Sequence, residues 1–304
     1  MNKLKGLFTA LITPFDTQNE VDEEGLRRLI RFQLEAHVDG ITPLGTTGEA
    51  PTLNEDEKHR IIAIAKEEIG SRSVLMVGTG SNSTSHTIQS TLEASELGAD
   101  LALVIVPYYN KPTQQGLFLH FQALAKESNI PIVIYNHPGR TGQGMQIDTI
   151  RRLAEIPNII GIKDATGNMA HVSDLIEAIN QIRPDFSVMS GNDEVTLPLM
   201  ALGGHGVVSV ASNLMPKEMK ALVDYASKGN FLKAKEEHYK IMPFIRATSI
   251  EINPIPIKAA MNLCGLPAGE CRLPLCNLSS DNAVQLEQAL RSYQILDCSG
   301  CVEK

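Results

Sequence analysis

A lysine interrupts an apolar run in the stretch IIGIKDATG, residues 159–167. Lysine is rarely fully buried unless another group pairs with it or the protein uses its amine. Side chains alternate along a strand, so Lys163 shares one face with Ile159 and Gly161. Burial lowers the pKa of a lysine by as much as about 3 to 5 units, and the neutral amine then forms a Schiff base with a ketone. The alternative interpretation is that Lys163 ends the strand and pairs with an acid such as Asp164.

Other reactive side chains follow the ends of neighbouring apolar runs. Tyr135 ends one such run, and a phenol beside an amine and a carbonyl can move protons between them. Thr46 and Thr47 follow another run and are able to relay protons or bind a carboxylate. Arg140 follows Pro-Gly in a loop and can hold a carboxylate through two hydrogen bonds. Each residue also has a structural role open to it, as a buried aromatic, a turn residue or a surface arginine.

The histidines do not form a recognisable metal motif. The eight histidines are scattered, and no H-x-H, H-E-x-x-H or carboxylate cluster lies at the expected strand ends. We therefore predict no metal ligands there, and we expect His137 and His205 to pack or to form hydrogen bonds.

The reactive residues lie on a repeated pattern of apolar runs and helical segments. Eight runs rich in Val, Ile and Leu recur along the chain: Leu7–Pro14, Gly40–Gly45, Ser73–Gly80, Leu101–Tyr109, Pro131–Pro138, Ile159–Ala165, Phe186–Gly191 and Gly206–Ser212. Segments in which apolar residues have helical spacing lie between the runs. In one of these segments Asn54 is the expected N-cap, with Glu57 three residues later and Gly70 at the end. Eight such units in 304 residues predict an α/β fold, a closed (β/α)8 TIM barrel with its functional side chains at the carboxyl ends of the strands. An open doubly wound sheet is disfavoured because no G-x-G-x-x-G follows the first run.

Beyond residue 212 the pattern consists of helices alone. The first of these completes the eighth unit, and the others form a C-terminal helical annex. We predict a barrel catalytic domain at 1–229 and an annex with a tail at 230–304. Cys298 and Cys301 form a lone C-x-x-C in that tail, with too few ligands for a metal site, so we expect a mobile end.

Composition excludes several classes of partner. The net charge is −8 and no Lys/Arg cluster occurs, which argues against nucleic acid. No apolar run approaches the roughly 18–20 residues of a membrane span, and the first residues lack a signal-peptide cleavage site. Five cysteines, an odd number without secretory signals, indicate reduced thiols and a cytoplasmic protein.

Seven motifs, in order between Gly6 and Leu290, resemble those of the dihydrodipicolinate synthase family. They are GTTGEAPTLNEDE, VGTGSNST, PYYNKPTQQGL, YNHPGRTG, GIKDATGN, SGNDEVTLPLMALGGHGVVSV and NPIPIK. The pair YN-x-P-x-RTG and GIK-[DE]-ATG is specific to pyruvate-dependent Schiff-base lyases, and the Thr-Thr pair with the arginine indicates the synthase branch. The resemblance implies condensation of pyruvate with L-aspartate 4-semialdehyde in diaminopimelate and lysine synthesis. It implies no added cofactor, because the protonated imine is the electron sink.

The resemblance also assigns catalytic roles to residues of this chain. Lys163 would form the imine with pyruvate. Tyr135, Thr46 and Tyr109 would form a proton relay, with Tyr109 reaching in from a neighbouring subunit. The family's usual assembly is a homotetramer, a dimer of dimers.

Substrate-binding roles follow from the same resemblance. Thr47 and the backbone of Gly191 and Val208 would hold the pyruvyl group, and Arg140 would bind the carboxylate of the semialdehyde. His137 stands where the family commonly has Val or Ile. Gly139 stands where Ser is frequent, so the mouth of the site differs in polarity.

Lysine-inhibited members of the family use a pocket at a tight dimer interface. This chain keeps Asn82 and Tyr108 there, but it has Glu55, Lys58 and His86 where such enzymes usually show His, His and Glu. We therefore expect this possible allosteric pocket to give weak or absent inhibition by lysine.

Two other functions remain open from the sequence. An N-acetylneuraminate lyase or a 2-keto-3-deoxy-sugar acid aldolase would share Lys163 and Tyr135, although those branches generally replace Arg140. A barrel that binds pyruvate as a regulator, without turnover, belongs to a different class.

Overall fold

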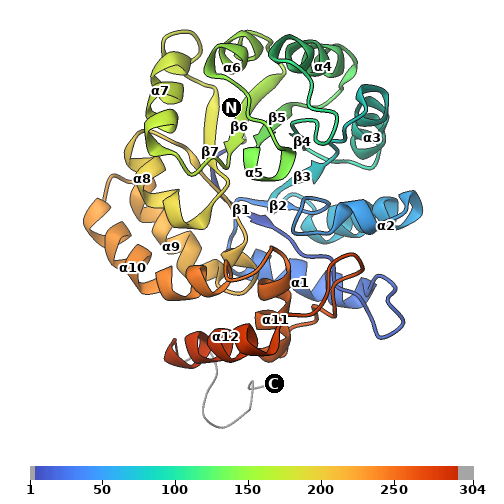
Figure 1. The fold of residues 1–304 in the computed structure, drawn as a ribbon, viewed down its shortest axis with the longest axis vertical. Coiled ribbons are helices and arrows are strands. Elements are labelled where there is room, and N and C mark those ends of the chain that lie inside the picture. Colours follow the sequence, from blue (N-terminus) through green and yellow to red (C-terminus); the bar gives the residue numbers. More distant parts are fainter. Residues whose placement is uncertain (1–3, 294–304) are drawn as a thin grey trace.

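The computed structural model describes residues 4–293 of the chain. Eight parallel strands follow one another in chain order around a closed barrel, with helices outside them (Figure 1). The strands are β1 (Gly6–Ala10), β2 (Gly40–Thr42), β3 (Val74–Gly78), β4 (Leu101–Ile105), β5 (Ile132–Asn136), β6 (Ile159–Asp164), β7 (Ser187–Ser190) and β8 (Gly206–Ser209). The predicted TIM barrel is confirmed.

The surrounding helices occupy the segments between the strands. They are α1 (Glu23–Glu35), α2 (Glu55–Ile69), α3 (Thr84–Glu96), α4 (Gln114–Glu127), α6 (Ile147–Ala154), α7 (Met169–Asn180), α8 (Thr196–Ala201) and α9 (Pro216–Ser227). Short helical turns lie in the loops at η1 (Ala50–Thr52), α5 (Pro138–Thr141), η2 (Asp193–Val195) and η3 (Ala211–Asn213). In α2 the Asn54 side chain accepts from the backbone N–H of Glu57, and the Glu57 carboxylate accepts from that of Asn54. This confirms the predicted capping box, with Gly70 as the C-cap.

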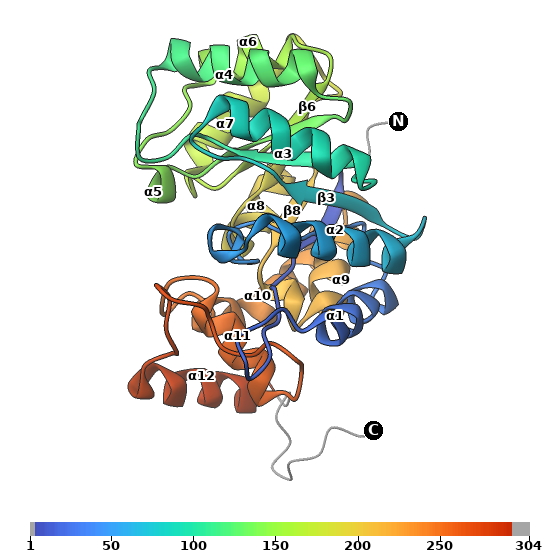
Figure 2. The ribbon, with the colours of Figure 1, turned by 90° about the vertical axis from the view of Figure 1, so that its right-hand side faces the viewer.

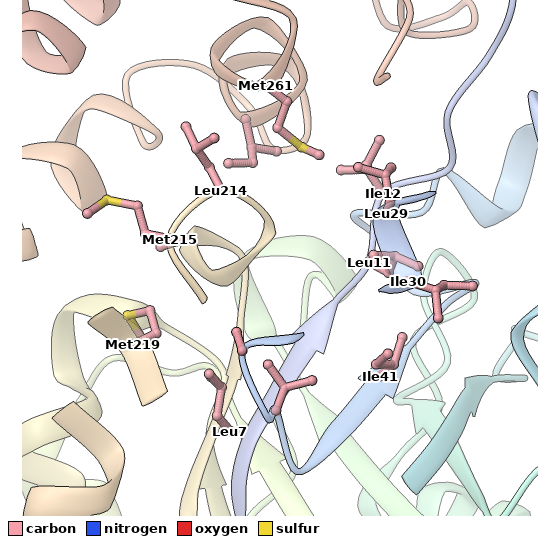
Figure 3. Close-up of a cluster of buried hydrophobic side chains, with 14 of the residues drawn as sticks. Leu7, Leu11, Ile12, Leu29, Ile30, Ile41, Leu214, Met215, Met219 and Met261 are labelled. Atoms are coloured by element: carbon pink, nitrogen blue, oxygen red, sulfur yellow. The ribbon is translucent and has the colours of Figure 1, made fainter. Parts of the chain in front are cut away.

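The strands end earlier than the apolar runs predict, and β1 shows why. It stops at Ala10, whereas the predicted run reaches Pro14. The next residues, Leu11 and Ile12, stay apolar because they enter a cluster between the barrel and the annex, which includes Met261 (Figure 3). The backbone N–H of Ile12 donates to the Asn213 side chain, 3.1 Å away, and not to a neighbouring strand.

The predicted C-terminal annex is also confirmed as helices. It consists of α10 (Phe231–Ala247), α11 (Ile255–Leu263) and α12 (Ser280–Ser292). In Figure 2, α11 and α12 lie beside one end of the molecule, and α10 connects them to α9. We propose residues 229 and 230, in the turn between α9 and α10, as the boundary between barrel and annex.

Cys298 and Cys301, the predicted tail cysteines, lie outside the described residues.

From residue 4 to residue 293, no helix has both the length and the apolar character that crossing a membrane requires.

Candidate active site

Lys163 lies inside the barrel, near the carboxyl end of β6. Its register partners are Tyr135 of β5 and Met189 of β7. The residue is only 6% exposed, and its Nζ lies 4.1 Å from the centre of the Tyr135 ring. Gly161, two residues earlier, faces Leu4, and a Cβ at Gly161 would lie 2.5 Å from a Leu4 methyl carbon. The face predicted from strand alternation is therefore the inner face of the barrel.

Asp164 does not serve as the partner of Lys163. Its carboxylate accepts hydrogen bonds from the Asn136 amide and from the N–H and hydroxyl of Thr166, and it lies 3.5 Å from Nε2 of His171. Burial acts to raise the pKa of Asp164, but the hydrogen bonds from His171 and Thr166 outweigh it and hold this pKa below its usual value. The ion-pair alternative for Lys163 is therefore wrong.

A comparison with Lys258 shows what is unusual about Lys163. These two are the buried lysines of the described part of the chain. Lys258 donates from Nζ to the Glu49 carboxylate at 2.8 Å, and to the carbonyls of Thr13 at 3.1 Å and Glu270 at 2.8 Å. Within residues 4–293 the amine of Lys163 has no hydrogen bond and no ion pair; the Tyr135 ring is its contact. An unpartnered buried amine is the group expected of a nucleophile.

Thr46 and Thr47 occupy the loop after β2. Thr46 lines a cavity of about 410 Å³, which Tyr135 and Arg140 also line. The hydroxyl of Thr47 accepts from the side-chain amide of Asn253, 2.9 Å away. The structure thus brings the predicted hydroxyl, phenol and guanidinium groups to one cavity.

Asn253 also holds Arg140. Nη2 of Arg140 donates to the Asn253 carbonyl, 3.2 Å away. One residue of the annex therefore contacts Thr47 through its side chain and Arg140 through its backbone. Asn253 begins the NPIPIK motif, and this motif is the signal in the sequence from which a role for Asn253 could have been predicted.

The charges at the mouth act on His137. Burial, together with the nearby Arg140 and Lys163 charges, lowers the pKa of His137 to about 4. The ring is therefore neutral near pH 7, and it meets the Tyr135 ring edge-on with 5.9 Å between centroids. His205 accepts from the Val188 N–H at 3.2 Å, which confirms its predicted role as a hydrogen-bonding residue.

The strands on the other side of Lys163 supply backbone groups and one buried acid. The N–H of Gly191 donates to the Asp164 carbonyl, and a Cβ at Gly191 would lie 2.6 Å from that of Ala165. Val208 lies within β8. Asp193 accepts from two N–H groups through Oδ2, and burial raises its pKa. Asp193 was not predicted as a site residue, because a single acid in a loop forms no pattern in the sequence.

Tyr109 is not brought to the cavity within this chain. Its side chain is 89% exposed, and its φ of 71° lies in the left-handed region. The adjacent Tyr108 lines the cavity instead.

The residues of the expected allosteric pocket lie on the same cavity, with one exception. Glu55, Lys58, His86 and Tyr108 line it beside Thr46. The fifth residue, Asn82, lies in the loop before α3, and its carbonyl accepts from the Asn110 amide at 2.8 Å.

In a closed (β/α)8 barrel, a buried lysine without a hydrogen bond in the described part of the chain lies beside a tyrosine at the ends of the strands, an arrangement suited to imine formation with a ketone. The chain belongs to the dihydrodipicolinate synthetase family, which matches residues 3–293. It is 54% identical over 287 residues to the 4-hydroxy-tetrahydrodipicolinate synthase of Protochlamydia amoebophila, a match that spans 94% of this chain and 96% of that protein.

Solved structures agree with this assignment. A dihydrodipicolinate synthase from Thermotoga maritima superimposes with a TM-score of 0.95 at 41% identity, over 97% of this chain and 100% of that one. The chloride-inhibited dihydrodipicolinate synthase of Acinetobacter baumannii, complexed with pyruvate, gives a TM-score of 0.94 at 40% identity, over 96% and 100% of the two chains.

Proposed function

We propose that this protein is a 4-hydroxy-tetrahydrodipicolinate synthase, which condenses pyruvate with L-aspartate 4-semialdehyde. The observation that carries the proposal is the buried amine of Lys163, which is without a hydrogen bond in the described chain and lies against the Tyr135 ring. Membership of the family and the similarity to a synthase complexed with pyruvate support the choice of substrate.

The chemistry begins at Lys163. Its amine adds to the ketone carbon of pyruvate, and the adduct loses water to form an imine that is protonated on nitrogen. The positive nitrogen withdraws electrons from the pyruvyl methyl group, and a base removes one methyl proton to give the enamine. Tyr135 contacts the Lys163 amine and lines the same cavity as Thr46, so these two side chains are the groups we propose to transfer that proton.

Carbon–carbon bond formation follows. The enamine carbon attacks the aldehyde of L-aspartate 4-semialdehyde, and the resulting alkoxide takes up a proton. The amino group of the semialdehyde then attacks the imine carbon, displaces the Lys163 amine and closes the ring. Lys163 is regenerated and no outside oxidant or reductant is consumed.

The remaining residues bind and orient. Arg140 holds the carboxylate of the semialdehyde at the mouth, which suits a guanidinium fork. Thr47 and the backbone of Gly191 and Val208 hold the pyruvyl group. The Asn253 contacts to Thr47 and Arg140 support this arrangement.

Tyr109 completes the relay from a neighbouring subunit. Its exposure, and the fact that it does not line the cavity of its own chain, support a role across an interface. We therefore propose a homotetramer, built as a dimer of dimers, in the cytoplasm. The free state of Cys264, Cys271 and Cys276 supports that compartment.

Borohydride trapping tests the proposal directly. Incubation with pyruvate and borohydride should leave a reduced adduct on the peptide that contains Lys163. The peptide with Lys258 is the internal control, because that lysine is also buried but its amine is hydrogen-bonded to Glu49, Thr13 and Glu270. An adduct on Lys258, or none in the wild type, would remove the Schiff-base proposal.

A second assay identifies the acceptor. Coupling to dihydrodipicolinate reductase should show consumption of aspartate semialdehyde by the wild type and not by Lys163→Ala. Activity with sialic acid or sugar acids alone would favour an aldolase of the same superfamily. Pyruvate binding without any turnover would indicate a regulator.

A further inference from the structure

Three potential ligands from two outer helices meet beside the cavity. Glu55 and His59 stand four residues apart on α2, on one face of the helix, and Glu93 approaches from α3. One ligand atom from each residue lies within 4.8 Å of the others. This group is separate from Lys163, and neither the proposed chemistry nor the family resemblance uses His59 or Glu93.

The hydrogen bonds around Glu93 hold its carboxylate in a definite orientation. Its Oε1 accepts from the Gln89 amide at 2.9 Å, and its Oε2 lies 3.1 Å from Nε2 of His59. These contacts place a carboxylate oxygen and an imidazole nitrogen, two common types of metal ligand, side by side.

The separations are close to those of a metal centre. Zinc–oxygen and zinc–nitrogen bonds of 2.0–2.2 Å put neighbouring tetrahedral ligands about 3.4 Å apart. The 3.1 Å between Nε2 of His59 and Oε2 of Glu93 is slightly shorter than that value, and the ligand atoms of all three residues lie within 4.8 Å of one another, so side-chain rotations can bring them to this spacing. The Glu55 side chain is half exposed, so solvent leaves it room to rotate once its ion pair with Lys58 is broken.

The surroundings leave room for the remaining ligands. Glu55, His59 and Glu93 all line the cavity of about 410 Å³ that Thr46 also lines. A catalytic or exchangeable zinc site has three protein ligands and one open position, which water or a ligand oxygen fills. Because all three residues line the cavity, water from it is available as the fourth ligand.

We propose that Glu55, His59 and Glu93 bind a divalent transition-metal ion of the zinc class, through two carboxylates and one imidazole. Nitrogen and oxygen ligands of this kind suit Zn²⁺. Lys58 opposes binding, because its Nζ lies 2.9 Å from Oε1 of Glu55 and carries a positive charge. The inference does not depend on the proposed enzymatic function.

Titration with zinc chloride, followed by calorimetry, tests the site in the full-length chain. Cys298→Ser and Cys301→Ser are included throughout, so that thiols of the tail do not bind the metal. We expect one Zn²⁺ per chain. His59→Gln and Glu93→Gln should each lower the affinity by about tenfold or more, as expected for the loss of one ligand of three.

Lys58→Gln is the decisive variant, because the proposal predicts that it binds Zn²⁺ more tightly than the wild type. Removing a positive charge next to Glu55 should raise the Zn²⁺ affinity by about tenfold, since charges a few ångströms apart near a protein surface interact by a few kcal/mol before screening. A variant that binds more tightly cannot be explained by misfolding.

His86→Gln is the matched control. His86 lines the same cavity but is not one of the three proposed ligands, so the affinity should stay within twofold. The proposal is overturned if Zn²⁺ does not bind saturably, if His86→Gln weakens binding as much as His59→Gln, or if Lys58→Gln leaves the affinity unchanged.

Discussion

Lys163 and Tyr135 are direct register partners on adjacent strands, with Nζ of the lysine 4.1 Å from the centre of the tyrosine ring. A lysine at this position meets an aromatic face and no carboxylate. The ring contacts the amine on one side, and no hydrogen bond joins the two side chains. The hydroxyl of the same tyrosine lies at the end of the ring, where it can handle protons for a ligand bound to the amine.

Tyr135→Phe separates these two roles. The substitution keeps the aromatic ring beside Lys163 and removes the proton-transferring hydroxyl. We expect kcat to fall by about 10²–10⁴-fold, the usual contribution of a general acid–base group. Borohydride trapping of pyruvate on Lys163 should persist at a reduced rate. A variant with wild-type turnover would exclude the hydroxyl from the relay.

Arg140→Ala should affect the second substrate more than the first. Losing a hydrogen-bonded charged group costs about 1.5–3 kcal/mol, or about 10- to 150-fold in kcat/KM for aspartate semialdehyde. Trapping of pyruvate should change less than threefold, because Lys163 is untouched. Arg140→Lys keeps the charge but not the fork and should recover part of the loss. Equal losses in trapping and in turnover would contradict the assignment.

Lys258 and Glu49 make a buried ion pair between the annex and the loop of Thr46. Lys258→Met leaves the Glu49 carboxylate buried without its counter-charge, which typically costs about 3–5 kcal/mol of unfolding free energy. Glu49→Gln should also destabilise the protein. The double variant removes both charges and should lose much less than the sum of the two, as measured by denaturant unfolding. Strict additivity of the two losses would show that the pair does not interact.

The features that were predicted from the sequence are local ones. Strand alternation around Lys163 and the capping box of Asn54 involve residues a few positions apart, and the structure confirms both. The barrel itself follows from eight repeats of one local pattern. The strand ends were less accurate, because apolar residues such as Leu11 continue past the strand to pack on the annex.

The features that escaped prediction join distant parts of the chain. Asn253 bonds Thr47 across 206 positions, and Lys258 pairs with Glu49 across 209. No periodicity links such residues, so only the folded chain brings them together. Tyr109 poses a related difficulty, since its expected partners belong to another subunit.

The response to lysine gives another prediction. Lys58 places a positive charge on the cavity wall, and its ion pair occupies Glu55, a carboxylate that an ammonium ligand would need. We expect lysine to inhibit weakly or not at all in an initial-rate assay. A submicromolar half-inhibitory concentration would contradict this. Lys58→His, the residue usual in lysine-inhibited relatives, should strengthen any inhibition that is present.

His120 makes the stability of the barrel depend on pH. The ring is 6% exposed on α4, and burial lowers its pKa from 6.5 to about 4. Because the folded-state pKa lies below the unfolded one, the unfolded chain binds more protons between these values. The contribution of neutral His120 is therefore complete above pH 6.5 and is lost as the pH falls towards 4. The shift of about 2.5 units corresponds to about 3 kcal/mol.

His120→Gln isolates this effect from that of other histidines, such as the partly buried His137, whose pKa is also lowered to about 4. Glutamine keeps a polar group near the Thr84 hydroxyl, which lies 2.9 Å from Nδ1 of the wild-type ring, but it does not take up a proton. Unfolding free energies from denaturant titrations between pH 7.5 and pH 4.5 should fall more steeply for the wild type than for the variant. Parallel curves would mean that His120 is protonated equally in the folded and unfolded chains. The difference in slope, unlike the absolute stability of the variant, does not depend on how well glutamine packs against Phe121, because packing contributes equally at every pH.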